Sequence, residues 1–586
     1  MRARDVRHYT LFFLLLAVLA AFLLWPIVST VTGGFLDTRG HFTLRFVVSV
    51  FHDPVWMGGL YNSLLIATFT TGLALLIALP LSVLGARYEF RGKAILASLL
   101  LVPLILPPFV GAIGLRAILG RYGALNAILF PGNRPGIDFL GGRFIGGRFA
   151  AIVLMEALHL YPILYLNVTA ALANLDPALD EAAQNLGAGA WRRFFRVTLP
   201  LILPGVFAGV TIVFIWSFTE LGTPLMFDYY QVTPVQVFWG LQEISTNPRV
   251  YALVVVMLAA AAGLYLLGRL AIGGRGYAMQ AKASVATTER RLTGLRAAAA
   301  MAAFLSVTFL AVLPHLGVIL SAFTVDGAWY HTILPSRWTL QHFKGALTQQ
   351  LAVTSIRNSL IYASTAMAVC LAAGLAISWL TVRARVRGGW LLDTLAMLPL
   401  AVPGLVMAFG YVAMSLSWPI RPLGDWLEAH GWVVLASLCR LTGSAPDPLV
   451  FLVIAYAVRR LPYTVRSATA GLEQTSVTLE EAARNLGASA LTTLRRITVP
   501  LIAANLIAGG ILAFSFAMLE VSDSLILAQR ESDFPITRAI YELFNRLGDG
   551  PYIASAMGVW GMILLSLTLI TAGLLMGRKM GALFRV

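Results

Sequence analysis

Long apolar runs separated by short polar segments dominate the chain. Each run holds about 20 or more mostly apolar residues, which a helix needs to cross the hydrocarbon layer of a bilayer. Apolar and polar residues do not alternate, as they would in the strands of a transmembrane barrel. The runs predict twelve membrane-spanning helices, near residues 9–31, 60–84, 94–115, 149–172, 203–227, 250–268, 297–323, 351–381, 391–416, 449–467, 502–527 and 553–576.

Composition excludes two broad classes of protein. The chain is 58% hydrophobic and 12% charged, whereas soluble domains are about 45–50% apolar and about 25% charged. An ordinary soluble enzyme and a disordered scaffold are both ruled out. The net charge of +16 comes mainly from arginines in short loops, which indicates orientation in a membrane rather than binding to nucleic acid. This charge pattern predicts that both termini are cytoplasmic.

An internal repeat relates the two halves of the chain. Matching residues recur at a near-constant spacing of about 300 positions, too regular for chance. The pairs include Asn62 with Asn358, Pro103 with Pro399, Pro107 with Pro403, Pro200 with Pro500 and Glu220 with Glu520. The repeat predicts an all-α polytopic membrane protein of two homologous six-helix halves, as in transporters with parallel repeats. We expect a first domain at 1–268, a basic cytoplasmic linker at 269–296 and a second domain at 297–586.

Two polar loops carry the strongest match between the halves. Residues 181–202 and 481–502 are identical at more than half of their positions, although loops usually vary. Asp176 and Ser476 are placed to cap a short helix in each loop. Gly187 and Gly487 are placed to end it in a left-handed conformation. We expect two helical loops that insert into a groove of a partner; the alternative is a pair of helical turns that only link two spans.

The pattern Glu-Ala-Ala…Gly…Pro in each loop resembles the EAA loop of binding-protein-dependent (MetI-like) ABC-importer permeases. Two such domains in one chain resemble the fused ferric-iron permeases, and also the thiamine and phosphonate permeases. In that family the loops are coupling helices that dock onto cytoplasmic ATPase subunits. The resemblance therefore assigns ATPase coupling to the residues Glu181, Ala182, Ala183 and Gly187 in the first half and Glu481, Ala482, Ala483 and Gly487 in the second.

The resemblance implies a permease of the bacterial cytoplasmic membrane that works by alternating access. Its partners would be two copies of an ABC ATPase, an extracytoplasmic substrate-binding protein and membrane lipid, with no nucleic acid. Ferric iron is the expected substrate, and organophosphonate, thiamine and polyamines are alternatives. The chain has no phosphate-binding Gly-x-x-x-x-Gly-Lys-Ser/Thr motif, so we expect no enzyme activity and no cofactor in this chain, with ATP and Mg²⁺ in the partner ATPase subunits. An ion-coupled secondary transporter of the major-facilitator type is the rival class, because it too has two parallel halves.

Polar residues within the predicted spans are candidates for the translocation path, because such residues are costly in a membrane. Glu220 and Glu520 either attract a cation, gate the path or act as structural acids. Arg459 and Arg460 either hold an anion, pair with Glu156 or reach the interface. These acids and bases favour opposite substrate charges, so the substrate charge stays open, as does any metal site. The remaining candidates are His159 and the helix-breaking residues Pro103, Pro107, Pro399 and Pro403.

Overall fold

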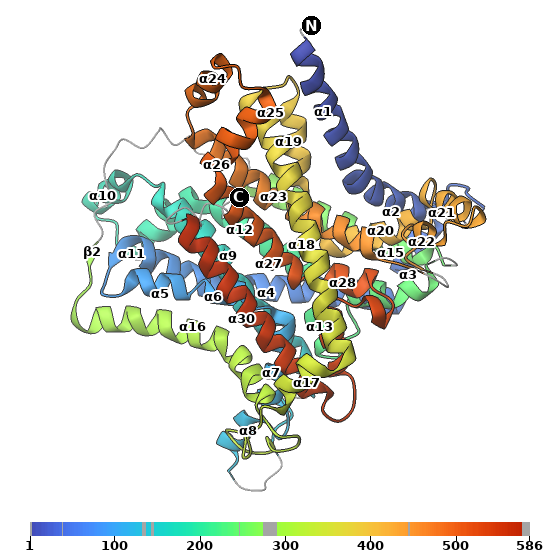
Figure 1. The fold of residues 1–586 in the computed structure, drawn as a ribbon. Helices are drawn as coiled ribbons and strands as arrows, with labels where there is room; N and C mark the ends of the chain where they lie inside the picture. The colour runs from blue at the N-terminus through green and yellow to red at the C-terminus, as the bar shows by residue number, and fades with distance from the viewer. Residues whose placement is uncertain are drawn as a thin grey trace. The chain divides into compact units, whose positions relative to one another are not determined.

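The structure is a computed structural model that describes residues 3–37, 39–131, 136–141, 146–244, 247–272, 290–442 and 446–576. Helices form almost all of the regular structure in this part of the chain (Figure 1). The two short strands described, β1 (Tyr88–Glu89) and β2 (Arg290–Arg291), pair in parallel. The predicted all-α fold is therefore confirmed. Residues 273–289 of the predicted linker lie outside the described residues.

The chain divides into two compact units, which we name after their longest helices. The α4 unit comprises Met57–Val235 and Met257–Thr339. Its helices include α4 (Pro54–Arg87), α5 (Lys93–Leu99), α6 (Val102–Ile105), α7 (Pro108–Leu119), α8 (Ala124–Leu129), α9 (Arg148–Ala173), α10 (Pro177–Asn185), α11 (Ala190–Arg193), the π-helix η2 (Phe194–Thr198), α12 (Leu199–Phe218), α13 (Gly222–Met226) and α16 (Gly294–Ala322).

Within the described residues, the α18 unit comprises 3–56, Gln236–Val256 and 340–576. It begins with α1 (Ala3–Leu19), η1 (Ala20–Leu24), α2 (Trp25–Phe35) and α3 (Arg45–His52). The helices α14 (Thr233–Gly240), η3 (Leu241–Glu243) and α15 (Arg249–Ile272) follow, with α14 and α15 extending past the unit's boundaries. The rest are α17 (Gln341–Thr348), α18 (Gln350–Ser378), η5 (Trp379–Arg383), α19 (Gly389–Met397), η6 (Leu398–Leu400), α20 (Gly404–Ser415), α21 (Ile420–Ala429), α22 (Val433–Ser437), α23 (Leu449–Gln474), α24 (Val477–Asn485), α25 (Ala490–Thr493), η7 (Leu494–Thr498), α26 (Val499–Leu501), α27 (Ala503–Met518), α28 (Ser522–Leu527), η8 (Glu531–Asp533), α29 (Ile536–Phe544) and α30 (Gly550–Met576).

Each unit contains the first span of the other sequence half. In the α4 unit, α16 packs on α7 so closely that a Cβ on Gly114 would meet the backbone carbonyl of Pro314. In the α18 unit, α2 packs on α20, where a Cβ on Gly410 would lie 2.7 Å from the Pro26 carbonyl oxygen. The predicted domains 1–268 and 297–586 describe the sequence repeat, and the compact units cut across them.

Small residues also allow close packing in the core of the α4 unit. Ala74 and Ala78 of α4 are fully buried beside Tyr161 of α9 and Phe304 of α16. The Tyr161 hydroxyl donates to the Leu100 carbonyl at 2.8 Å. Because lipid is as apolar as these side chains, tight packing and satisfied hydrogen bonds hold such helices together.

Eight helical segments within the described residues are long and apolar enough to cross a membrane, or up to eleven if each of three bent pairs is one span. The bent pairs lie at the third, ninth and eleventh predicted spans, with bends of 93°, 106° and 77°. The tenth predicted span is the continuous helix α23, which does not meet the same criteria. It carries Arg459, Arg460 and Arg466 within its length.

Candidate functional site

The two repeated loops, residues 176–202 and 476–502, fold as predicted at their helix ends. The Ala178 amide donates to the Asp176 carboxylate at 3.0 Å, which caps α10. The Thr478 amide donates to the Ser476 hydroxyl at 3.3 Å, which caps α24. Gly187 and Gly487 have φ values of +81° and +88°, a backbone region in which glycine carries no Cβ penalty. Each loop is therefore a short helix, a left-handed turn and a second short helix.

Both repeated loops expose apolar side chains at matching positions. Leu186 and Leu486 are each 88% exposed. Trp191 and Leu491, at the start of the second short helix, are 77% and 72% exposed. Exposed apolar residues beside a fixed turn are typical of a surface that a partner covers.

The predicted coupling residues lie in the same two loops as these apolar side chains. In each loop the Glu and the first Ala of the Glu-Ala-Ala run are exposed, and the second Ala is half-buried. A Cβ added to Gly187 or Gly487 would have no atom within 4 Å. The turn is thus open to an approaching molecule in both loops.

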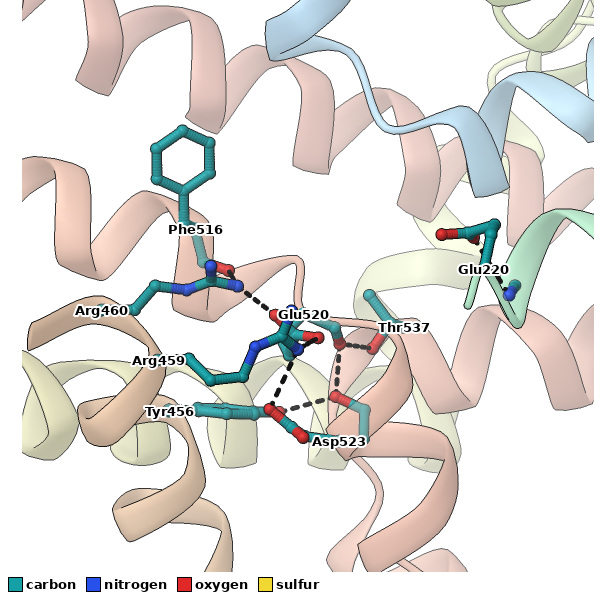
Figure 2. A network of polar contacts seen from close by, with 10 residues as sticks. Glu220, Tyr456, Arg459, Arg460, Phe516, Glu520, Asp523 and Thr537 are labelled. Atoms are coloured by element: carbon teal, nitrogen blue, oxygen red, sulfur yellow. Dashed lines mark hydrogen bonds and ion pairs between the residues drawn. The ribbon is translucent and has the colours of Figure 1, made fainter. Parts of the chain in front are cut away.

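A buried network of charges occupies the α18 unit (Figure 2). Arg459 and Arg460 of α23 both form ion pairs with the carboxylate of Glu520, which follows α27. Arg459 also lies 3.3 Å from the carboxylate of Asp523, whose side chain is fully buried. Two cations therefore face two anions, a balance that buried charges require.

Neutral groups hold the backbone around Glu520 in place. The hydroxyls of Ser524 and Thr537 donate to the Glu520 carbonyl at 2.5 and 2.6 Å, and the Tyr456 and Ser524 hydroxyls lie 2.6 Å apart (Figure 2). Arg460 also donates to the Phe516 carbonyl at 3.1 Å. The network joins α23, α27, α28 and α29 around Glu520, through its carboxylate and its backbone carbonyl.

The corresponding acid of the α4 unit has a different role. Glu220 accepts the amide hydrogens of Gly222 and Thr223 at 3.1 and 3.2 Å, at the start of α13. Glu156 is buried and accepts hydrogen bonds from Ser217 and, at 3.5 Å, from Thr70. One of its oxygens, Oε1, has no hydrogen-bond partner among the described residues. Equivalent positions in the repeat thus carry different chemistry.

Comparison with known proteins identifies the family. The model of the family described as "Binding-protein-dependent transport system inner membrane component" matches residues 78–313 and again residues 350–579. These two matches cover most of the chain. The chain belongs to this family. It is a permease of an ABC importer and a protein of the inner membrane, built from two copies of the family domain.

Relatives of this permease are named for different transported substrates. The ferric transport system permease protein FbpB of Actinobacillus pleuropneumoniae is 25% identical over 92% of this chain and 74% of its own length. The molybdenum transport system permease protein ModB of Escherichia coli is 35% identical over 30% of this chain and 72% of its own. A crystal structure of a bacterial ABC transporter involved in alginate import aligns with a TM-score of 0.40 at 16% identity, over 47% of this chain and 97% of that one.

The predicted prolines lie at two of the bent spans of this permease. Pro107 and Pro403 are extended residues that directly precede α7 and α20. Pro103 and Pro399 lie just before the bends, in α6 and η6. A bend of this kind frees backbone carbonyls from the helix, and each buried one needs a donor.

Side chains from other helices contact the backbone at these bends. His159 contacts the Pro103 carbonyl through Nδ1 at 2.8 Å, and His315 contacts the Pro107 carbonyl through Nε2 at 3.2 Å. In the α18 unit the guanidinium of Arg459 lies directly against Gly404, so a Cβ there would clash. His159 and Arg459 occupy equivalent places in the repeat, and each lies against a bend.

Two residues of these sites, Asp523 and His315, could not be recognised from the sequence. Asp523 stands three positions after Glu520, but its counterpart in the first half is Thr223. His315 belongs to the first span of the second half, and nothing in its sequence indicates that it packs on the first half. Within the described residues, no group of three or more His, Cys, Asp or Glu side chains fits a metal ion.

Proposed function

We propose that this permease imports ferric iron, delivered by an extracytoplasmic binding protein and driven by two copies of a partner ABC ATPase. The supporting observation is the similarity to FbpB across both halves, over 92% of the chain. Iron is here the cargo, and the ATP and Mg²⁺ belong to the partner subunits. Both termini and both repeated loops lie on the cytoplasmic side in this proposal.

The repeated loops are the proposed ATPase contacts. Each loop exposes two apolar side chains, Leu186 and Trp191 or Leu486 and Leu491, and also a glutamate, Glu181 or Glu481. Exposed apolar side chains of this kind suit a hydrophobic groove in a partner. ATP binding would bring the two ATPases together and move both loops, so that the translocation path opens to the outer side of the membrane. ATP hydrolysis would return the path to a state that opens to the cytoplasm.

Molybdate is the second candidate cargo. The Escherichia coli molybdenum permease ModB is 35% identical to one part of the chain, a higher identity than that of FbpB over a shorter length. Organophosphonate, thiamine and polyamines remain further alternatives. The buried network in the α18 unit, two arginines and two acids, is balanced in charge and so favours neither a cation nor an anion.

Uptake in cells with and without the gene tests the proposal. We expect deletion to abolish uptake of radiolabelled ferric citrate that depends on ATP, and to leave molybdate uptake unchanged. A parallel sample depleted of ATP shows whether the uptake is ATP-driven. If deletion abolished molybdate uptake alone, the cargo would be molybdate rather than ferric iron. Iron uptake that resists ATP depletion but needs a proton gradient would instead support a secondary transporter.

A further inference from the structure

An arginine at the end of α18 holds the second repeated loop. Arg383 is the last residue of η5, which continues α18, and its side chain is only 7% exposed. Its Nε lies 2.9 Å from the carboxylate of Glu480 in α24, which is 4% exposed. Arg383 therefore joins the long span directly to the loop.

The same arginine also caps a second span. Its Nη2 lies 2.8 and 2.9 Å from the carbonyl oxygens of Leu472 and Thr475 and 2.7 Å from the Thr475 hydroxyl. These groups lie at the C-terminal end of α23, where backbone carbonyls lack helical partners. One guanidinium thus connects α18, α23 and α24. Because breaking a buried pair leaves an uncompensated charge, the contact resists separation of these elements.

The first repeated loop has an equivalent arginine and a shorter acid, Asp180, in a looser arrangement. Arg87 ends α4, and its Nη2 lies 3.8 Å from the carboxylate of Asp180 in α10. That carboxylate also lies 3.6 Å from Nε of Arg193. Arg87 donates instead to the Thr198 hydroxyl at 2.6 Å, at the end of η2. Aspartate is one methylene shorter than glutamate, which fits the longer ion pair.

We infer that Arg383 and Glu480 form a clamp that makes the second repeated loop move as one body with α18 and α23, whereas the first loop is held less rigidly by Arg87. The inference rests on the proposed role of these loops as ATPase contacts. In that role Arg383 is a positioning residue: it passes displacement of the loop to the spans and does not itself touch ATPase or cargo. The two ATPase contacts of this permease are then mechanically unequal.

Hydrogen exchange of the full-length permease in lipid nanodiscs tests the clamp without any partner. Arg383→Ala should speed exchange of the α24 amides by about tenfold or more, as expected for loss of a hydrogen-bonded charge pair. Arg87→Ala is the matched variant and should change the α10 amides by less, because Arg87 lies 3.8 Å from its acid whereas Arg383 lies 2.9 Å from Glu480. A second arginine faces the acid in each loop, Arg193 at 3.6 Å in the first and Arg484 at 3.9 Å in the second. The conservative variant Arg383→Lys keeps a positive charge and hydrogen-bond donors at this position and should retain much of the protection. Unchanged exchange in Arg383→Ala, or equal effects in both loops, would overturn the inference.

A distance measurement then tests whether the clamp transmits motion. Spin labels at Val477→Cys and Ile361→Cys, two exposed positions outside the proposed ATPase contacts, report on α24 and α18 once Cys370 and Cys439 are replaced by alanine. In the complex with its ATPase, ATP and vanadate should leave this distance unchanged in the otherwise native chain and alter it in Arg383→Ala. A nucleotide-dependent change in both would contradict the clamp. A permease that binds no ATPase would refute the proposed function, whereas the exchange result would stand on its own.

Discussion

At the scale of single residues, the two halves of this permease use equivalent positions of the repeat for different purposes. Glu520 neutralises two arginines, whereas Glu220 accepts amide hydrogens at the start of a helix. The repeat predicts that these acids are equivalent, and they do follow equivalent spans. Their roles differ because the neighbours on the fourth and tenth predicted spans differ: His159 stands where the second half has Arg459.

Neutralising the two acids should therefore have unequal effects. Glu520→Gln leaves two guanidiniums facing Asp523 alone, and removing one partner of a buried pair costs about 3–5 kcal/mol. Glu220→Gln keeps an oxygen that accepts the same amide hydrogens, so its cost should be about 1 kcal/mol. Thermal unfolding of the purified permease in detergent measures both.

The double variant Glu520→Gln with Arg460→Met provides the control, because it restores the balance of charge. It should recover part of the lost thermal stability. Equal losses in Glu520→Gln and Glu220→Gln would show that the network does not depend on the charge of Glu520.

At the scale of helices, apolar length predicts most of the spans, because a bilayer requires about 20 apolar residues whatever the fold. The caps at Asp176 and Ser476 and the turns at Gly187 and Gly487 were also predictable, since each depends on local chemistry. The helix on which the first span of each half packs could not be predicted. Hydrophobicity indicates that α16 enters the membrane, but it does not indicate that α16 packs on α7. The histidine at 315 therefore became visible as a site residue only in the structure.

The contact between α7 and α16 gives a test at this scale. Gly114→Ala places a methyl group against the Pro314 carbonyl, and overpacking of this kind costs about 1–3 kcal/mol. Gly72→Ala in α4 meets nothing within 4 Å and should be neutral or stabilise the helix by about 0.5–1 kcal/mol. Thermal unfolding in detergent compares the two. A Gly114→Ala protein as stable as Gly72→Ala would mean that the helices do not approach so closely.

At the scale of the whole molecule, the account depends on the two repeated loops. The family model matches twice along the chain, at 78–313 and 350–579. Each compact unit contains one repeated loop with an exposed leucine beside a left-handed glycine. If the two loops only linked membrane spans, they would not need exposed apolar side chains at the same positions. The proposed ATPase contacts explain the duplication, and the energy for transport then enters at two places.

The most direct test of this account is co-purification of a partner ABC ATPase with the permease. Leu186→Asp with Leu486→Asp places charge on two side chains that are each 88% exposed, so the fold should be unaffected while the partner surface is lost. The control Leu547→Asp alters a leucine that is 99% exposed outside both loops. We predict that the double variant inserts normally but no longer retains the ATPase or supports ATP-dependent uptake, whereas Leu547→Asp does both. Full ATPase retention and uptake in the double variant would contradict the account.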